Sequence, residues 1–246
     1  MVAGPAAADA VRRAHANPGL RVGLHLVVIE GHAVLPPADI PDLVDANGWF
    51  PSAQFRLGMR YALRPQVRDQ LAAEIRAQFT AFAATGLRLD HANAHKHMHL
   101  HPVIGRLLVL IGWDFGLRAV RVPAEPPDVM EACGVRVSLG DRALYAWTDR
   151  LREQVARAGM QANDHVFGLA WSGHMTRDHL LALARHLPDG VSEIYLHPAA
   201  RRDAALDALM PDYEHEAELA ALLDPEVRAA FQAAAEPIDS IWRRNA

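Results

Sequence analysis

Five histidines lie within eleven residues of this chain, in a segment that runs from Asp90 to Pro102. All of them fall on one parity, so in an extended backbone their side chains would point to the same face. Pro102 suits the first position of a helix, and the apolar run that follows it favours a helix there. The segment therefore predicts a strand that ends near His95, a short turn, and a helix from Pro102. The residues on the shared face are His91, Asn93, His95, His97, His99 and His101.

A cluster of imidazoles suits a divalent metal, because neutral imidazole is the commonest metal ligand and binds Zn, Ni, Co and Fe. A metal site with an open position uses about three protein ligands, usually from separate elements. We therefore expect one histidine of the segment to be a ligand, and the others to orient it, bind substrate or cap the helix. A His-rich tract can also bind metal without a biological role, and this alternative stays open here.

Strand-like apolar runs alternate with helical segments along the whole chain, which favours parallel βα units. His25, His95 and His197 lie within or at the ends of separate predicted strands. The working residues of (β/α) barrels come from the carboxyl ends of several strands, so these histidines could converge on a metal. The predicted strands cover residues 20–29, 89–95, 116–123, 163–169, 191–198 and 238–242, and the predicted helices cover 6–16, 64–84, 102–112, 141–160, 176–186, 203–210, 213–223 and 225–235.

Residues 34–63 interrupt this alternation with an irregular segment that is rich in proline and aromatic residues. Loops of this length in compact domains are often lids or binding loops. A packed surface loop is the equally weighted alternative.

Composition excludes several classes of function. With 51% hydrophobic and 22% charged residues, the 246-residue chain has the composition of an ordinary globular protein. Its formal charge of −4 gives no electrostatic reason to expect nucleic-acid binding. No apolar run approaches the ~20 residues that span a bilayer, and the start of the chain does not resemble a signal peptide. Cys133 is the single cysteine, so we expect no internal disulfide and a cytoplasmic location.

Three motifs together resemble the YdjC-type carbohydrate deacetylases. They are Gly-Leu-His-Leu at residues 23–26, the histidine segment from Asp90 to Pro102, and Glu-Ile-Tyr-Leu-His-Pro at residues 193–198. Further segments resemble, more narrowly, the branch of that family associated with hopanoid biosynthesis. These are residues 21–26, 30–31, 34–37, 40–45 and 163–168.

The resemblance implies a single domain over residues 1–246, folded as a distorted (β/α) barrel. It implies a divalent metal, Mg²⁺ or Zn²⁺, held by one aspartate and two histidines, which by motif position are His25 and His95. His197 matches the family histidine that protonates the leaving amine. The implied substrate is an amino-sugar glycolipid or another N-acetylated sugar, and for this branch an N-acetylglucosaminyl hopanoid lipid that loses its acetyl group.

One departure from the family pattern affects these expectations. Family members begin with a strand that ends in a Thr-Ala-Asp-Asp-Phe-Gly-like motif, whereas this sequence has no Asp-Asp pair. We therefore expect the first strand and the helix after it to be missing, and with them the metal aspartate and the catalytic base. The open strand edges could pair with a second copy in a homodimer. Asp90, Asp128 and Asp164 are the aspartates that could substitute as ligands.

Two other functions stay open at this point. The chain could be a remnant that binds metal or sugar without turnover. It could also be an unrelated barrel metallohydrolase, such as a phosphoesterase, that uses the same histidines.

Overall fold

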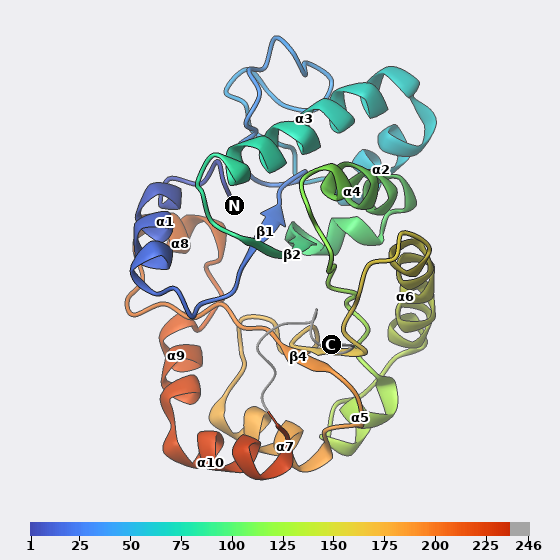
Figure 1. Cartoon of the computed structure of the whole chain (residues 1–246). Helices are drawn as coiled ribbons and strands as arrows, with labels where there is room; N and C mark the ends of the chain where they lie inside the picture. Colours follow the sequence, from blue (N-terminus) through green and yellow to red (C-terminus); the bar gives the residue numbers. More distant parts are fainter. Residues whose placement is uncertain (237–246) are drawn as a thin grey trace. The chain divides into compact units, whose positions relative to one another are not determined.

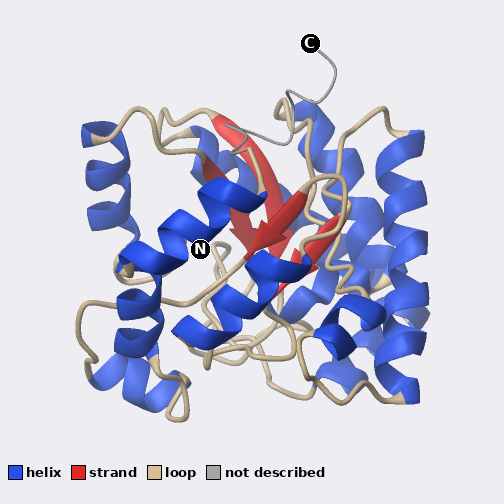
Figure 2. Ribbon diagram, turned by 90° about the horizontal axis from the view of Figure 1, so that it is seen from below, coloured by secondary structure: helices blue, strands red, loops and turns tan. Residues whose placement is uncertain are grey.

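The computed structural model describes residues 1–236, and Figure 1 follows their elements along the chain. The structure is an α/β protein in which short strands are joined mainly by helices (Figure 2). The helices are α1 (Ala7–Ala16), α2 (Gln54–Leu63), α3 (Pro65–Ala83), α4 (Pro102–Asp114), α5 (Pro127–Ala132), α6 (Leu139–Arg157), α7 (Arg177–His186), α8 (Ala204–Leu209), α9 (His215–Leu223) and α10 (Pro225–Ala234), with a 3-10 helix η1 (His95–Leu100). The strands are β1 (Val22–Leu26), β2 (Leu89–Ala94), β3 (His165–Phe167) and β4 (Ser192–Ile194).

The chain divides into two compact units. The amino-terminal unit comprises Met1–Arg121 and Asp149–Ala162, and the carboxyl-terminal unit comprises Val122–Thr148 and the described residues from Asn163 onward. No described helix is long and apolar enough to cross a membrane.

Strand pairing in both units is parallel, as the alternation of elements predicts. β1 pairs with β2 and β3 pairs with β4, and in the amino-terminal unit two isolated parallel bridges continue from β2 through Ala119 and Val120 to Gln161. The prediction of about six strands in one curved sheet is not met among the described residues, where these strands form two separate pairs. The predicted strand at 238–242 lies outside the described residues.

Side-chain amides explain why two predicted strands are shorter than expected. Gln78 accepts a hydrogen bond from Val27 N and donates one to Val27 O, at 2.9 and 2.6 Å. Asn163 accepts from Val122 N and donates to Val122 O, both at 2.8 Å. Each amide supplies the donor and acceptor that a neighbouring strand would offer. β1 therefore ends at Leu26, and residues 116–123 form bridges rather than a regular strand.

The segment at residues 34–63 is packed and partly helical. Its last ten residues form α2, which the sequence analysis did not predict. Buried Glu74 on α3 accepts hydrogen bonds from Val34 N and Leu35 N, both at 2.9 Å. Tyr61 is fully buried and donates to Val28 O at 2.9 Å. These contacts favour the packed loop over the mobile lid.

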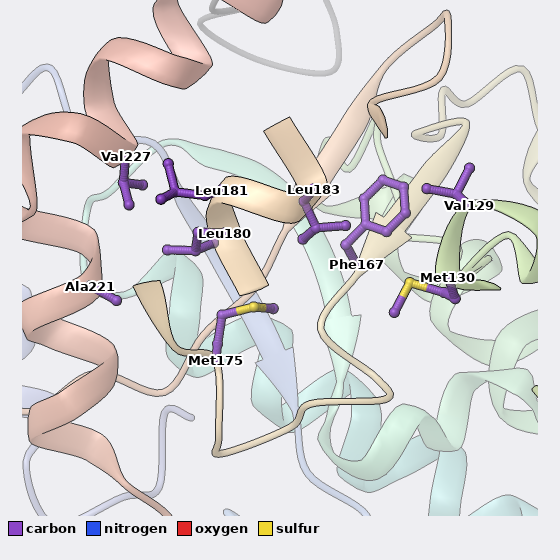
Figure 3. Packing of buried hydrophobic residues seen from close by; sticks show 9 residues of the cluster. All are labelled: Val129, Met130, Phe167, Met175, Leu180, Leu181, Leu183, Ala221 and Val227. Atoms are coloured by element: carbon purple, nitrogen blue, oxygen red, sulfur yellow. The ribbon is translucent and has the colours of Figure 1, made fainter. Parts of the chain in front are cut away.

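The carboxyl-terminal unit has its own apolar core, shown in Figure 3. Three leucines of α7, namely Leu180, Leu181 and Leu183, face Phe167 of β3 and the helices α9 and α10. Each fully buried side chain of this size stabilises the fold by about 1.5–3 kcal/mol. The core contains Val129, Met130, Phe167, Met175, Leu180, Leu181, Leu183, Ala221 and Val227.

Candidate functional site

Two histidines of separate strands meet in the amino-terminal unit. His25 of β1 and Asn93 of β2 are register partners, so the β1–β2 pairing brings their side chains together. His25 Nδ1 lies 2.5 Å from Asn93 Oδ1. Its other ring nitrogen, Nε2, lies 3.4 Å from Nδ1 of His95, the residue that directly follows β2. The predicted proximity of His25 and His95 is therefore present in the structure.

The protonation state of His25 follows from its surroundings. Burial lowers the pKa of His25 to about 3, against the opposing effect of the hydrogen bond that His25 donates to Asn93. The imidazole is therefore neutral at pH 7. With Asn93 Oδ1 as acceptor, the ring proton sits on Nδ1, and the lone pair of Nε2 is directed toward His95. This arrangement fixes a metal-ligating tautomer by a hydrogen bond to the opposite ring nitrogen.

The spacing of the two imidazoles fits a shared metal ion. Two nitrogens bound at about 2.0–2.1 Å to one tetrahedral ion lie about 3.3 Å apart. The 3.4 Å between His25 Nε2 and His95 Nδ1 matches this value. Among residues 1–236, no set of three His, Cys, Asp or Glu side chains is arranged to hold a metal ion. The described residues thus offer two nitrogen ligands.

Backbone in the left-handed region follows both histidines. Glu30, Lys96 and His97 are non-glycine residues with φ of 44°, 49° and 53°. Lys96 Nζ and Glu30 carboxylate form an ion pair of 2.5 Å, which joins the segment after β1 to the turn after β2. Left-handed backbone at such residues persists only where the surroundings enforce it, and it clusters at functional sites.

The left-handed turn also ends the alternation of the histidine segment. His91 and Asn93 keep the predicted parity on β2, but Lys96 and His97 reverse the chain direction. The predicted strand that ends near His95, with a turn before Pro102, is therefore confirmed, and the shared face does not extend past the strand. His99 shows the consequence: it is buried, and its Nε2 donates to Arg121 O at 2.8 Å.

The remaining histidines of the segment pack against backbone or side chains of the amino-terminal unit. His91 lies against the backbone of Gly23, where a Cβ atom would come within 2.5 Å of its Nε2. Its Nδ1 is 3.1 Å from buried Asp90. His97 and His99 have ring centroids 6.2 Å apart. His101 packs edge-on to Tyr61.

The three aspartates considered as substitute ligands do not complete the pair. Asp90 contacts His91, as described above. Asp128 is exposed in the first turn of α5. Asp164 accepts from Val191 N at 2.7 Å and holds the segment that leads into β4. The last two belong to the carboxyl-terminal unit.

His197 lies in the carboxyl-terminal unit, three residues after β4. Its backbone N–H donates to Glu218 Oε2 at 2.5 Å, and its carbonyl accepts from His215 Nδ1 at 2.5 Å. Its ring packs edge-on to Tyr213, with centroids 5.1 Å apart. Sequence reasoning identified His197 but missed these neighbours, because Tyr213, His215 and Glu218 read only as part of a polar helix.

A cavity of about 370 Å³ lies at the opposite, amino-terminal end of β1 and β2. Its lining is mixed: apolar residues such as Leu20 and Leu87 lie beside His15, Arg21, Arg88 and Asp90. In parallel βα folds the working residues lie at the carboxyl ends of strands. His25 and His95 satisfy that rule, so we place the candidate site there.

The parallel βα units and the paired imidazoles at strand ends define an α/β protein with a candidate site at the carboxyl ends of β1 and β2. A sequence profile described as YdjC-like protein matches residues 1–233. The chain therefore belongs to the YdjC-like protein family.

Relatives of this chain include proteins named carbohydrate deacetylase. One from Brevibacillus brevis is 27% identical over 223 residues, which cover 89% of this chain and 76% of the relative. One from Vibrio vulnificus strain YJ016 is 31% identical over 238 residues, which cover 94% of this chain and 78% of the relative. A crystal structure from Enterococcus faecalis V583, of a candidate cellobiose-phosphate cleavage protein, superposes with a TM-score of 0.71. It is 20% identical and the match covers 95% of this chain and 82% of that one, which shows the shared fold.

Proposed function

We propose that this protein is a metal-dependent hydrolase that removes the acetyl group from an N-acetylated amino sugar. The observation that carries the proposal is the 3.4 Å approach of His25 Nε2 to His95 Nδ1, with Asn93 fixing the His25 tautomer. The relatives named carbohydrate deacetylase support the choice of a sugar amide as the substrate class.

In this mechanism His25 and His95 would hold a divalent ion, Mg²⁺ or Zn²⁺. When bound, such an ion polarises the amide carbonyl and lowers the pKa of a bound water. Asn93 keeps the Nδ1 proton of His25 in place, so that Nε2 stays a ligand at neutral pH. Water adds to the carbonyl carbon and releases a proton to solvent, the C–N bond breaks, acetate leaves, and the amine nitrogen gains a proton. We assign delivery of that proton to the imidazolium of His197, by its motif position.

The finer parts of the proposal rest on sequence resemblance. We propose an N-acetylglucosaminyl hopanoid lipid as the substrate, because residues 163–168 and the segments near β1 resemble the hopanoid-associated branch. The parallel pairing of all four strands supports a distorted (β/α) barrel, and the family match over residues 1–233 supports a single domain. The cytoplasmic location and the homodimer stay predictions.

The deciding experiment measures acetate release from an N-acetylglucosamine glycoside, with Mg²⁺ or Zn²⁺ supplied. We compare the parent with His25→Ala, His95→Ala and His197→Gln, and with His186→Ala as a control on the exposed last turn of α7. Loss of the proton donor should lower kcat by ~10²–10⁴-fold, and loss of either ligand by at least as much. The control should match the parent.

The same preparations should be tested on a sugar phosphate ester. Metal-dependent phosphate release without acetate release would replace the proposed activity by that of a phosphoesterase. Metal binding without release of either product would replace it by a binding role.

A further inference from the structure

We propose that the outer face of α2 is a docking surface for an anionic lipid membrane. The proposal concerns where the protein binds, and it does not depend on the activity proposed above. All of the residues that carry it belong to the amino-terminal unit.

The two faces of α2 differ in what they contact. On the inner face, Leu57 and Tyr61 are buried, and the Tyr61 hydroxyl donates to Val28 O at 2.9 Å. This face packs α2 against α3 and α4 (Figure 1). The helix is therefore held in place by one face, and its other face is exposed.

The outer face carries an apolar stripe. Phe55, Met59 and Leu63 are spaced four residues apart, so their side chains lie along one side of the helix. The side chain of Phe55 is 83% exposed, that of Leu63 69% and that of Met59 44%. Single apolar residues scattered over a surface need no explanation, but a contiguous patch of large ones marks an interaction surface. α2 thus has two apolar faces, of which the fold covers one.

The segment around α2 is also positively charged. Residues 46–68 contain four arginines and neither aspartate nor glutamate, whereas the whole chain has a formal charge of −4. Arg60 donates a hydrogen bond to Asp42 O, and its guanidinium lies 3.5 Å from the Asp42 carboxylate, which balances this arginine. The other three arginines are exposed, namely Arg56, Arg64 and Arg68. The apolar stripe is therefore accompanied by a net positive charge.

An apolar stripe beside exposed arginines matches an anionic membrane surface. An amphipathic helix that lies in the interface buries its apolar side chains at the acyl boundary, and its basic residues bind anionic head groups. A second copy of this chain fits less well. A two-fold contact would place the same patch on itself, so the arginines of both copies would oppose each other, and like charges in an interface disfavour association. The charge therefore favours a lipid surface.

The position of α2 connects this surface to the candidate site. Tyr61 contacts Val28 in the segment directly after β1, the strand that carries His25, and its ring packs edge-on to His101 in the segment after β2. A helix with its side chains is about 10–12 Å across. A membrane on the outer face of α2 would therefore lie about one helix diameter from the segments that follow these strands.

The test is co-sedimentation of the full chain with sucrose-loaded vesicles at low salt. One set of vesicles contains phosphatidylcholine alone, and the other contains phosphatidylcholine and phosphatidylglycerol. Phe55→Gln/Leu63→Gln removes both ends of the stripe, and Arg56→Gln/Arg64→Gln removes two of its cations. Glutamine is a good helix former, and all four positions are exposed, so both variants should fold. Circular dichroism checks this.

Two matched controls lie outside this surface. Leu139→Gln removes an apolar side chain that is 87% exposed at the start of α6, a helix with Asp141 in its first turn. Arg228→Gln removes an exposed arginine of α10. Both controls should bind vesicles as the parent does.

We expect the parent to bind the phosphatidylglycerol vesicles, and to bind them less as the salt concentration rises. Each arginine near an anionic surface contributes about fivefold to the partition coefficient. Arg56→Gln/Arg64→Gln should therefore lower that coefficient by ~10–30-fold on anionic vesicles. Phe55→Gln/Leu63→Gln should lower it by ~100-fold, because burial of each large apolar side chain contributes on the order of tenfold or more.

Failure of the parent to bind anionic vesicles at low salt would overturn the proposal. Equal binding by the parent and Phe55→Gln/Leu63→Gln, or an equal loss in Leu139→Gln, would overturn it as well. Sedimentation equilibrium tests the second copy: a parent dimer that Phe55→Gln/Leu63→Gln dissociates, without vesicle binding, would assign the stripe to self-association instead. None of these measurements uses acetate release, so failure of this proposal and failure of the proposed function are distinguishable.

Discussion

The two units hold their candidate functional histidines in opposite ways. In the amino-terminal unit, His25 is fixed through its ring, by Asn93 from the neighbouring strand. In the carboxyl-terminal unit, His197 is fixed through its backbone, by Glu218 and His215. The first arrangement selects one tautomer, and the second selects a position.

The difference matches the chemistry proposed for each residue. A metal ligand must present one lone pair in one direction, so a hydrogen bond to its other nitrogen helps it. A proton donor must be held within reach of the atom that it protonates.

The largest expected effect comes from removing a ligand. His95→Ala should lower the affinity for Zn²⁺ by more than ~100-fold, because loss of an outer-shell partner alone reduces affinity by ~10–100-fold. A competition titration with a chromophoric chelator measures the change, with His186→Ala as control. Equal Zn²⁺ affinity in His95→Ala and the parent would contradict the assignment of His95.

Removing the ring contact of His25 should have the next largest effect. Asn93→Ala frees the tautomer of His25, so Zn²⁺ affinity should fall by ~10–100-fold. Asn163→Ala is the matched control, since it also removes a buried asparagine, but one that bonds backbone groups of Val122 and His165 instead of a histidine ring. A similar loss of affinity in both variants would show that stability, and not the tautomer, controls binding.

The close packing of the two strands predicts a smaller effect. Gly23→Ala puts a Cβ atom within 2.5 Å of His91 Nε2, so it should destabilise the protein by about 1–3 kcal/mol. Gly19→Ala meets no atom within 4 Å and serves as the control. Urea unfolding measures both. An unchanged midpoint for Gly23→Ala would mean that His91 moves aside without loss.

The smallest effect concerns pH. Burial lowers the pKa of His99 from 6.5 to about 3, so between these values the unfolded chain binds a proton that the folded chain does not. Protonation then favours unfolding, and the free energy of unfolding should rise with pH across this window, by up to about 1.4 kcal/mol per pH unit for one such group. His99→Gln can still donate to Arg121 O, and should reduce the slope.

Urea unfolding at pH 4.5, 5.5 and 6.5 tests the pH prediction, with His186→Gln as the exposed control. His25 should contribute a slope of the same sign, because burial also lowers its pKa to about 3. An identical slope in His99→Gln and the parent would contradict the effect attributed to His99.

Much of the local structure could be predicted from the sequence. The helices α1, α3, α4, α6 and α7 lie close to the predicted ranges, because apolar periodicity, proline at helix starts and glycine at turns are local signals. The parallel pairing followed from the alternation of strands and helices, and the change from β2 to a turn near His95 followed from Pro102. His25, His95 and His197 were identified by their places at strand ends and in motifs.

The tertiary structure decided what these local signals do not encode. The lengths of β1 and the segment at 116–123 depend on Gln78 and Asn163, whose amides come from 51 and 41 residues away. The left-handed turn at Lys96 is paired with Glu30 across two strand ends, and the alternation of histidines gave no sign of it. The partners of His25 and His197 were hidden for the same reason: a hydrogen bond between distant residues depends on which backbones pack together, and a local pattern carries no record of that.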